Sequence, residues 1–190
     1  MADLRIEGPA WLAEVELPSL APTATDDERM GWVLDVLDRQ VDEGTGGPFA
    51  AAVFSGVTGA VLGVGVNRVE PTSTCIAHAE MLALAAATQT IGCFTLDGHQ
   101  AVLVSSTEPC AMCLGALVWA GIHRVVCGAG DRDARAVGFD EGDKPLHWRD
   151  ALQRRGIDVV LGVHAPRAAA AMERYVHAGG TVYNGDLDDR

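Results

Sequence analysis

The sequence predicts an α/β fold, and three observations support this prediction. Short apolar strands alternate with helices along most of the chain. The 190 residues are enough for one domain with a buried core, and 48% of them are hydrophobic against 21% charged, as in ordinary globular proteins. No apolar run approaches the roughly 20 residues that a membrane-spanning helix needs. We therefore expect one soluble domain over residues 25–180, preceded by an irregular arm and followed by a short tail.

The first elements expected after the arm at residues 1–24 are a helix and a hairpin. Thr25 and Glu28 have the spacing of a capping box, and apolar residues then recur at helical intervals as far as Val41. Glycines and Pro48 end this helix. The apolar segments 48–55 and 60–67 follow, separated by a glycine-containing turn, which is typical of a β-hairpin with two mostly buried strands.

Helices and strands alternate over the rest of the chain. The expected elements are a helix over 78–90, a strand over 101–106, a helix over 110–120, a strand over 122–128, a helix around 148–155, a strand over 157–162 and a helix over 166–177. The segment from Gly130 to Pro145 is rich in glycine and charged residues. Loops of this length are more often functional than idle, so we expect this one to border the site.

Charge and cysteine content narrow the class of function. The net charge of −12 and the isoelectric point near 4.7 would repel a phosphate backbone, which favours a small-molecule substrate over a nucleic acid. Five cysteines, an odd number, fit reduced thiols or a metal site better than a disulfide framework. The first residues do not have the pattern of a secretory signal, so a cytoplasmic location is expected.

Two short motifs hold the residues suited to metal chemistry. His78 and Glu80 stand at the start of one expected helix, and Cys110 and Cys113 at the start of another. Positions i and i+3 lie on one side of a helix, so both thiolates can face one ion. His78 and Glu80 are about 200° apart around a helix and converge only beyond its N-terminus. An ion between two helix ends satisfies both constraints.

The number of ligands favours catalysis over a structural role. His78, Cys110 and Cys113 are three protein ligands, and catalytic zinc sites leave the fourth tetrahedral position to water. Zinc lowers the pKa of such a water enough to supply hydroxide at neutral pH. Glu80 would take the water proton and pass protons to a ring nitrogen and a departing amine.

Two other interpretations of the cysteines are open. Cys110 and Cys113 also have the spacing of a thioredoxin-type redox pair, although that interpretation leaves His78 and Glu80 without a role. A structural zinc would need a fourth protein ligand, for which Cys75 or Cys127 is available.

Several segments resemble one family. His-x-Glu followed by Pro-Cys-x-x-Cys is a signature of zinc deaminases that act on bases. Together with GGPFAA at 46–51, Asn67, SSTEPCAMCLGALVWAGI and VGFDE at 137–141, it resembles the cytidine deaminase-like superfamily, specifically its bacterial guanine deaminase branch. The likeness covers about residues 25–145. Residues 145–190 are not matched.

The resemblance implies a fold, a cofactor and an assembly. It implies a three-layer α/β/α sandwich with a five-stranded mixed sheet and one Zn²⁺ per subunit, held by His78, Cys110 and Cys113. It also implies that Asn67 and the backbone of Ala77 contact the substrate. Members are usually homodimers or larger, so the tail over 181–190 is expected to contact a neighbouring subunit.

The substrate expected from the resemblance is guanine, hydrolysed to xanthine and ammonia. Asp133 and Glu141 would face the pocket, Asp133 as an acceptor for purine donors and Glu141 as a second catalytic carboxylate; the alternative for both is a solvated acid in a charged loop. Phe49 and Trp119 either wall the ring or are simple core residues. Cytosine, cytidine or guanosine is the main alternative substrate, followed by tRNA adenosine and by a non-enzymatic zinc module.

Overall fold

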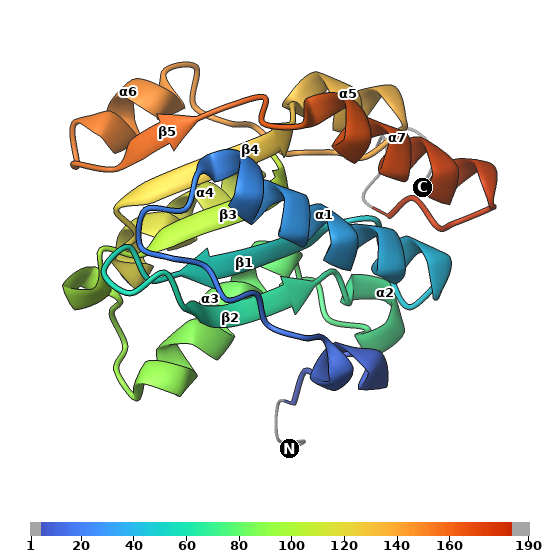
Figure 1. Ribbon diagram of the computed structural model, residues 1–190. Helices are drawn as coiled ribbons and strands as arrows, with labels where there is room; N and C mark the ends of the chain where they lie inside the picture. Colours follow the sequence, from blue (N-terminus) through green and yellow to red (C-terminus); the bar gives the residue numbers. More distant parts are fainter. Residues whose placement is uncertain (1–4, 184–190) are drawn as a thin grey trace.

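A five-stranded mixed sheet forms the centre of the computed structural model, which describes residues 5–183 (Figure 1). Its strands are β1 (Ala50–Phe54), β2 (Val61–Val66), β3 (Val102–Thr107), β4 (Arg124–Ala129) and β5 (Asp158–Val160). The spatial order is β2-β1-β3-β4-β5. β1 pairs antiparallel with β2 and β3, whereas β3, β4 and β5 run parallel. The expected α/β fold with a five-stranded mixed sheet is confirmed.

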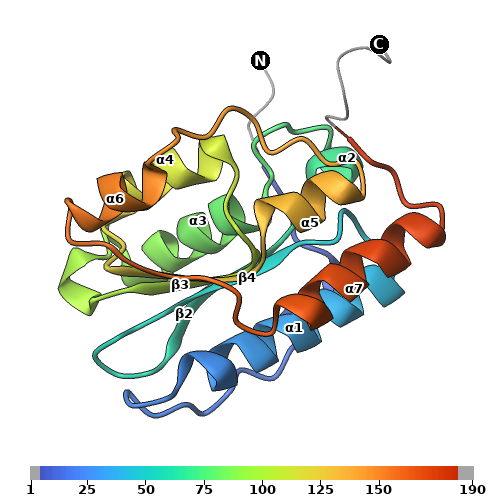
Figure 2. The same ribbon diagram turned by 90° about the horizontal axis from the view of Figure 1, so that it is seen from above.

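Helices cover both faces of the sheet, which gives three layers (Figure 2). α1 (Asp26–Asp42) and α7 (Ala165–His177) lie side by side on one face, and α3 (Ala79–Ile91), α4 (Ala111–Ala120) and α6 (Trp148–Gln153) cover the other. The strand residues follow the same division. Ala50, Ala52 and Phe54 join the core under α1, while Ala51 and Val53 join the core under α3, because side chains alternate across a strand.

The N-terminus of α1 has the capping box expected from the sequence. The Thr25 hydroxyl accepts a hydrogen bond from the Glu28 backbone N–H at 3.2 Å, and the Glu28 carboxylate accepts one from the Thr25 backbone N–H at 2.7 Å. Two of the N–H groups left free at a helix start are thereby satisfied.

Two glycines of β2 position α3. A Cβ atom at Gly65 would collide with the backbone of Ala79 and Ala83, and one at Gly63 would collide with the backbone of Ala83 and Ala87. The missing side chains therefore let the whole of α3 lie directly on the strand. This close approach sets the place of the α3 N-terminus, where His78 and Glu80 lie.

Some elements differ from the sequence-based expectations. The segment expected as one loop, 130–145, begins with the short helix α5 (Asp131–Ala136). A single turn, α2 (Val69–Thr72), and two 3₁₀ helices, η1 (Ala10–Glu14) and η2 (Asp97–His99), were not expected either. These are too short to show a hydrophobic period, which is the main sequence signal for a helix.

The C-terminal segment that the resemblance left unmatched is integral to the fold. It supplies α6, the edge strand β5 and α7, whose buried residues Ala168, Ala171 and Met172 complete the core under α1. None of the helices within residues 5–183 is long and apolar enough to cross a membrane.

Candidate active site

Three potential metal ligands meet where α3 and α4 begin. His78 and Cys110 are the N-cap residues of these two helices, and neither side chain caps its own helix, so both donor atoms remain free. Cys113 lies in the first turn of α4 and is fully buried. The three donors therefore converge at the N-termini of two helices, as the residue spacing predicts.

The three donors fit one zinc ion. Their ligand atoms lie within 4.8 Å of one another, and Cys110 Sγ is 3.5 Å from His78 Nδ1. Tetrahedral zinc, with bonds of about 2.0–2.3 Å, separates two of its ligand atoms by about 3.4–3.8 Å. The hydrogen bond between the two thiols lowers the pKa of Cys110 to about 4 and, together with burial, raises the pKa of Cys113, so Cys110 is the thiol that ionises first.

Within residues 5–183 this cluster contains three protein donors and not four. Cys127 is buried in β4 in the core under α3, and burial raises the pKa of its thiol. Cys75 is exposed on the loop before His78. Neither cysteine belongs to the cluster, which leaves one tetrahedral position for water or substrate, as in catalytic zinc sites.

Glu80 lies beside the cluster, on the first turn of α3. Its side chain is buried, and burial, followed by the negative charge of Cys110, raises its pKa above the ordinary value. A buried carboxyl group next to a metal-bound water is suited to accept and return a proton.

A small, partly open cavity lies beside the metal cluster. Its lining comes from the residue before β1, the residue after β2, the end of β3, both metal-bearing segments, the loop after α5 and the C-terminal segment: Phe49, Asn67, His78, Glu80, Thr107, Glu108, Cys110, Phe139, Asp140, Glu141 and Tyr183. Its volume is about 20 Å³, which accommodates about one water molecule.

Tyr183 accounts for the small volume. Its hydroxyl accepts a hydrogen bond from Asn67 Nδ2, and its ring lies edge-on to Phe139 with a centroid distance of 5.4 Å. Phe139 in turn lies edge-on to Phe49 at 4.9 Å. Three aromatic rings and an amide donor thus form part of the cavity wall.

The orientation of the Asn67 amide follows from its local contacts. Its Oδ1 accepts a hydrogen bond from the Val69 backbone N–H at 3.2 Å, which directs Nδ2 into the cavity. Asn67 is 1% exposed, so this donor is shielded from bulk water. Of the expected substrate contacts, Asn67 and Phe49 both line the cavity.

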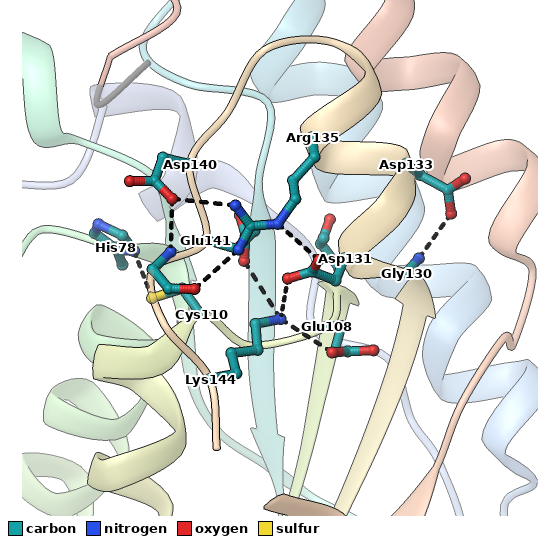
Figure 3. Close-up of polar contacts among 12 residues, drawn as sticks. His78, Glu108, Cys110, Gly130, Asp131, Asp133, Arg135, Asp140, Glu141 and Lys144 are labelled. Atoms are coloured by element: carbon teal, nitrogen blue, oxygen red, sulfur yellow. Dashed lines mark hydrogen bonds and ion pairs between the residues drawn. The ribbon is translucent and has the colours of Figure 1, made fainter. Parts of the chain in front are cut away.

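Glu141 lines the cavity from the loop that follows α5 (Figure 3). Its backbone carbonyl accepts a hydrogen bond from Ala111 N at 3.0 Å, which joins this loop to the start of α4. Burial raises the pKa of its carboxyl to about 8; nearby Lys144 opposes this effect, while the charges of Cys110 and Glu80 add to it.

Three expected substrate contacts are not brought to the cavity. Asp133 instead caps α5: its carboxylate accepts a hydrogen bond from Gly130 N at 2.8 Å (Figure 3). Trp119 is 84% exposed near the end of α4, because its position faces away from the sheet. Ala77 is buried, but its N–H donates to Thr74 O and its carbonyl accepts from Arg68 N, so its backbone stabilises its own loop.

The structure adds residues that sequence reasoning missed. Phe139 and Glu108 both belong to segments that carried the resemblance, but nothing marked them individually. Lys144 contacts Glu108 and Glu141. One feature of the sequence could have marked Lys144, since it is the only lysine of the chain. No feature of the sequence marked Tyr183. The expected contact of the tail with another subunit concerns residues mostly outside the described part, and Thr181 and Tyr183 contact their own chain.

Known proteins share this architecture and these motifs. Residues 24–129 match the family model of the cytidine and deoxycytidylate deaminase zinc-binding region. Guanine deaminase from Bacillus subtilis (strain 168) is 38% identical over 115 residues, which are 57% of this chain and 71% of that protein.

Solved structures extend the similarity to nearly the whole chain. A structure of guanine deaminase from Nitrosomonas europaea has a TM-score of 0.85 and 38% identity, covering 91% of this chain and 96% of that one. A structure of the protein NE0047 in complex with 2,6-diaminopurine has a TM-score of 0.87 and 38% identity, with coverages of 95% and 96%. Such coverage is too high to leave out the whole of residues 145–183, so most of this segment has a counterpart there.

Proposed function

Because this chain belongs to the cytidine and deoxycytidylate deaminase zinc-binding family, we propose that its substrate is guanine, which it hydrolyses to xanthine and ammonia. One observation carries the proposal. The three-donor cluster opens onto a cavity lined by the aromatic rings of Phe49, Phe139 and Tyr183 and by the Asn67 amide donor. A flat purine base can pack against such rings and accept a hydrogen bond from such a donor. Similarity to solved guanine deaminase structures over nearly the whole chain supports the same substrate.

His78, Cys110 and Cys113 would hold the zinc ion. When bound, zinc supplies a water of lowered pKa as the nucleophile for the carbon that carries the amine. Glu80 takes the proton of the attacking water and returns protons to the adjacent ring nitrogen and to the leaving amine. One water is consumed and one ammonia is released, and the buried Glu80 carboxyl both accepts and returns protons.

The remaining cavity residues hold the ring. Asn67 offers its Nδ2 donor to an acceptor on the purine edge, and Phe49 and Phe139 pack against the purine. Glu141 lines the same cavity and would act as an acid or a hydrogen-bond acceptor for the amine of the substrate. Its burial and its raised pKa suit this role. The ring of Tyr183 occupies the space of the substrate, so binding requires Tyr183 to move aside.

A free base is favoured over its nucleoside because a ribose replaces one ring N–H donor of the base. The cavity volume of about 20 Å³ does not distinguish the two, since both are larger and both require Tyr183 to move. A buried polar group left without its partner costs roughly 1–3 kcal/mol, so a substrate with the wrong pattern of donors and acceptors is disfavoured as well.

Ammonia release by the zinc-loaded protein tests the substrate. The panel is guanine, guanosine, cytosine, cytidine and ammeline, with xanthine formation followed by its ultraviolet absorbance. We expect the highest kcat/KM for guanine and a much lower value for guanosine. A higher kcat/KM for guanosine or cytosine would contradict the proposal.

We also propose that the chain forms a homodimer through α4. This helix contains no charged residue, and Met112 and Trp119 are exposed on it two turns apart. Two chains of net charge −12 repel each other over most of their surface, but they can approach along an uncharged apolar helix. Sedimentation velocity should show a dimer at micromolar concentration and a monomer for Trp119→Glu. A wild-type monomer, or a dimer of unchanged affinity in the variant, would refute this assembly.

A further inference from the structure

The only lysine of the chain is buried behind the cavity. Lys144 is unusual in this sequence, because every other residue of the Lys or Arg type is an arginine. Its side chain is 8% exposed, and its ammonium lies 3.0 Å from Glu108, 3.0 Å from Asp131 and 3.7 Å from Glu141 (Figure 3). A lysine is rarely buried to this extent unless it is paired.

These three carboxylates come from three separate segments. Glu108 follows β3 and stands two residues before the ligand Cys110, Asp131 is the first residue of α5, and Glu141 lies on the loop after α5. Lys144 therefore joins the segment that carries a metal ligand to the loop that carries Glu141. Without its charge, three acids would stand close together in a poorly solvated place and repel one another.

Lys144 does not line the cavity, whereas Glu108 and Glu141 do. It contacts both of these lining carboxylates without lining the cavity itself. Burial alone would lower the pKa of Lys144, but hydrogen bonds to Asp131 and Glu108 outweigh burial and raise it, so the ammonium stays charged. Any effect of Lys144 on a bound ring has to pass through these neighbours.

We propose that Lys144 is a positioning residue that holds the Glu141 carboxylate in place for the deamination. The inference rests on the proposed function, because Glu141 is assigned to the substrate there. A lysine suits the task because its compact ammonium can lie 3.0 Å from both Glu108 and Asp131 while its charge stays 3.7 Å from the Glu141 carboxylate. The planar guanidinium of arginine cannot reproduce that arrangement.

Arg135 is the natural control for the loss of a cation. It pairs with Asp131 at 2.8 Å and with Asp140 at 3.2 Å, and it is much more exposed than Lys144 (Figure 3). It therefore shares one carboxylate with Lys144, while no hydrogen bond or ion pair joins it to Glu108 or Glu141 among the described residues. Exposed ion pairs contribute little, so Arg135→Met should lower activity by less than about fivefold.

The kinetic test uses four variants with equal zinc content: Lys144→Met, Arg135→Met, Glu141→Gln and the double variant Lys144→Met with Glu141→Gln. We expect Lys144→Met to lower kcat about 10- to 100-fold, the usual cost of removing a group that orients a site residue, with KM nearly unchanged. Lys144→Arg should recover only part of the loss. The double variant should be no slower than Glu141→Gln, because Lys144 acts through that carboxylate.

An unaltered kcat in Lys144→Met, or losses that multiply in the double variant, would overturn the proposal. The assays use the panel member that the wild-type enzyme turns over fastest. A wild-type enzyme that prefers another base therefore contradicts guanine as the substrate without affecting the test of Lys144.

A second measurement leaves Lys144 unchanged. Lysine labelled with ¹³C at Cε gives a single side-chain signal in this chain. In the zinc-loaded wild-type protein, we expect this signal to shift when 2,6-diaminopurine binds and to shift far less in labelled Glu141→Gln. An unmoved wild-type signal at a ligand concentration that saturates the site by calorimetry would overturn the coupling.

Discussion

The two sides of the cavity are built in different ways. On one side, His78, Cys110 and Cys113 stand at the starts of two regular helices that pack on the sheet. On the other side, Glu141 lies on an irregular loop whose position depends on Lys144 and on a backbone hydrogen bond to α4. The difference teaches that two regular helices packed on the sheet arrange the metal ligands, whereas the loop side depends on side-chain and backbone contacts of an irregular segment.

The largest expected effect is on the metal side. Cys110→Ser should lose the zinc and all measurable deamination, because a serine hydroxyl does not ionise readily and is a poor replacement for a thiolate. Elemental analysis and ammonia release measure both losses. The matched control is Cys75→Ser, which removes an exposed thiol outside the cluster and should keep both. Loss of zinc from Cys75→Ser would instead indicate that Cys75 is a fourth protein ligand, as in a structural zinc site.

Glu80→Gln comes next and should keep the zinc. The amide preserves the shape of the side chain but cannot accept the proton of water, so kcat should fall by at least about 10²- to 10⁴-fold. Binding of 2,6-diaminopurine, followed by calorimetry, should change little. Turnover within tenfold of the wild-type enzyme would remove Glu80 from the proton transfers.

The acids of the loop side provide a direct comparison. Glu141→Gln should lower kcat about 10- to 100-fold, since it alters a carboxylate of the cavity wall. Asp133→Asn should leave kcat and KM close to wild type, because the amide oxygen can still cap α5 by accepting from Gly130. Steady-state kinetics on guanine measure both. A larger loss for Asp133→Asn than for Glu141→Gln would reverse the assignment of the two acids.

The smallest effect is expected for the aromatic residues. Phe49→Ala should raise KM for guanine roughly tenfold, since it removes a cavity wall and its contact with Phe139. Trp119→Ala, on the exposed side of α4, should leave KM unchanged at protein concentrations that keep the oligomer intact. Equal KM values for Phe49→Ala and the wild-type enzyme would show that the ring binds elsewhere.

Success and failure of the sequence-based predictions follow the same division. The α1 capping box, the hairpin of β1 and β2 and the two metal-bearing helix starts are all set by residues a few positions apart, and each was predicted. Asp133 and Trp119 show the limit. Both lie near the right segments, but one side chain turned to its own helix start and the other to solvent. Sequence spacing does not indicate which way a loop side chain points.

The sequence by itself determined the α/β class, the zinc ligands and the acid beside them, because helix and strand periods act over short stretches of chain. Only the tertiary structure decided which residues enclose the cavity. Tyr183 is 116 positions from Asn67, and Lys144 is 36 positions from Glu108, yet each pair is in contact. Such contacts depend on how the sheet and its helices bring distant segments together, and no local pattern records them.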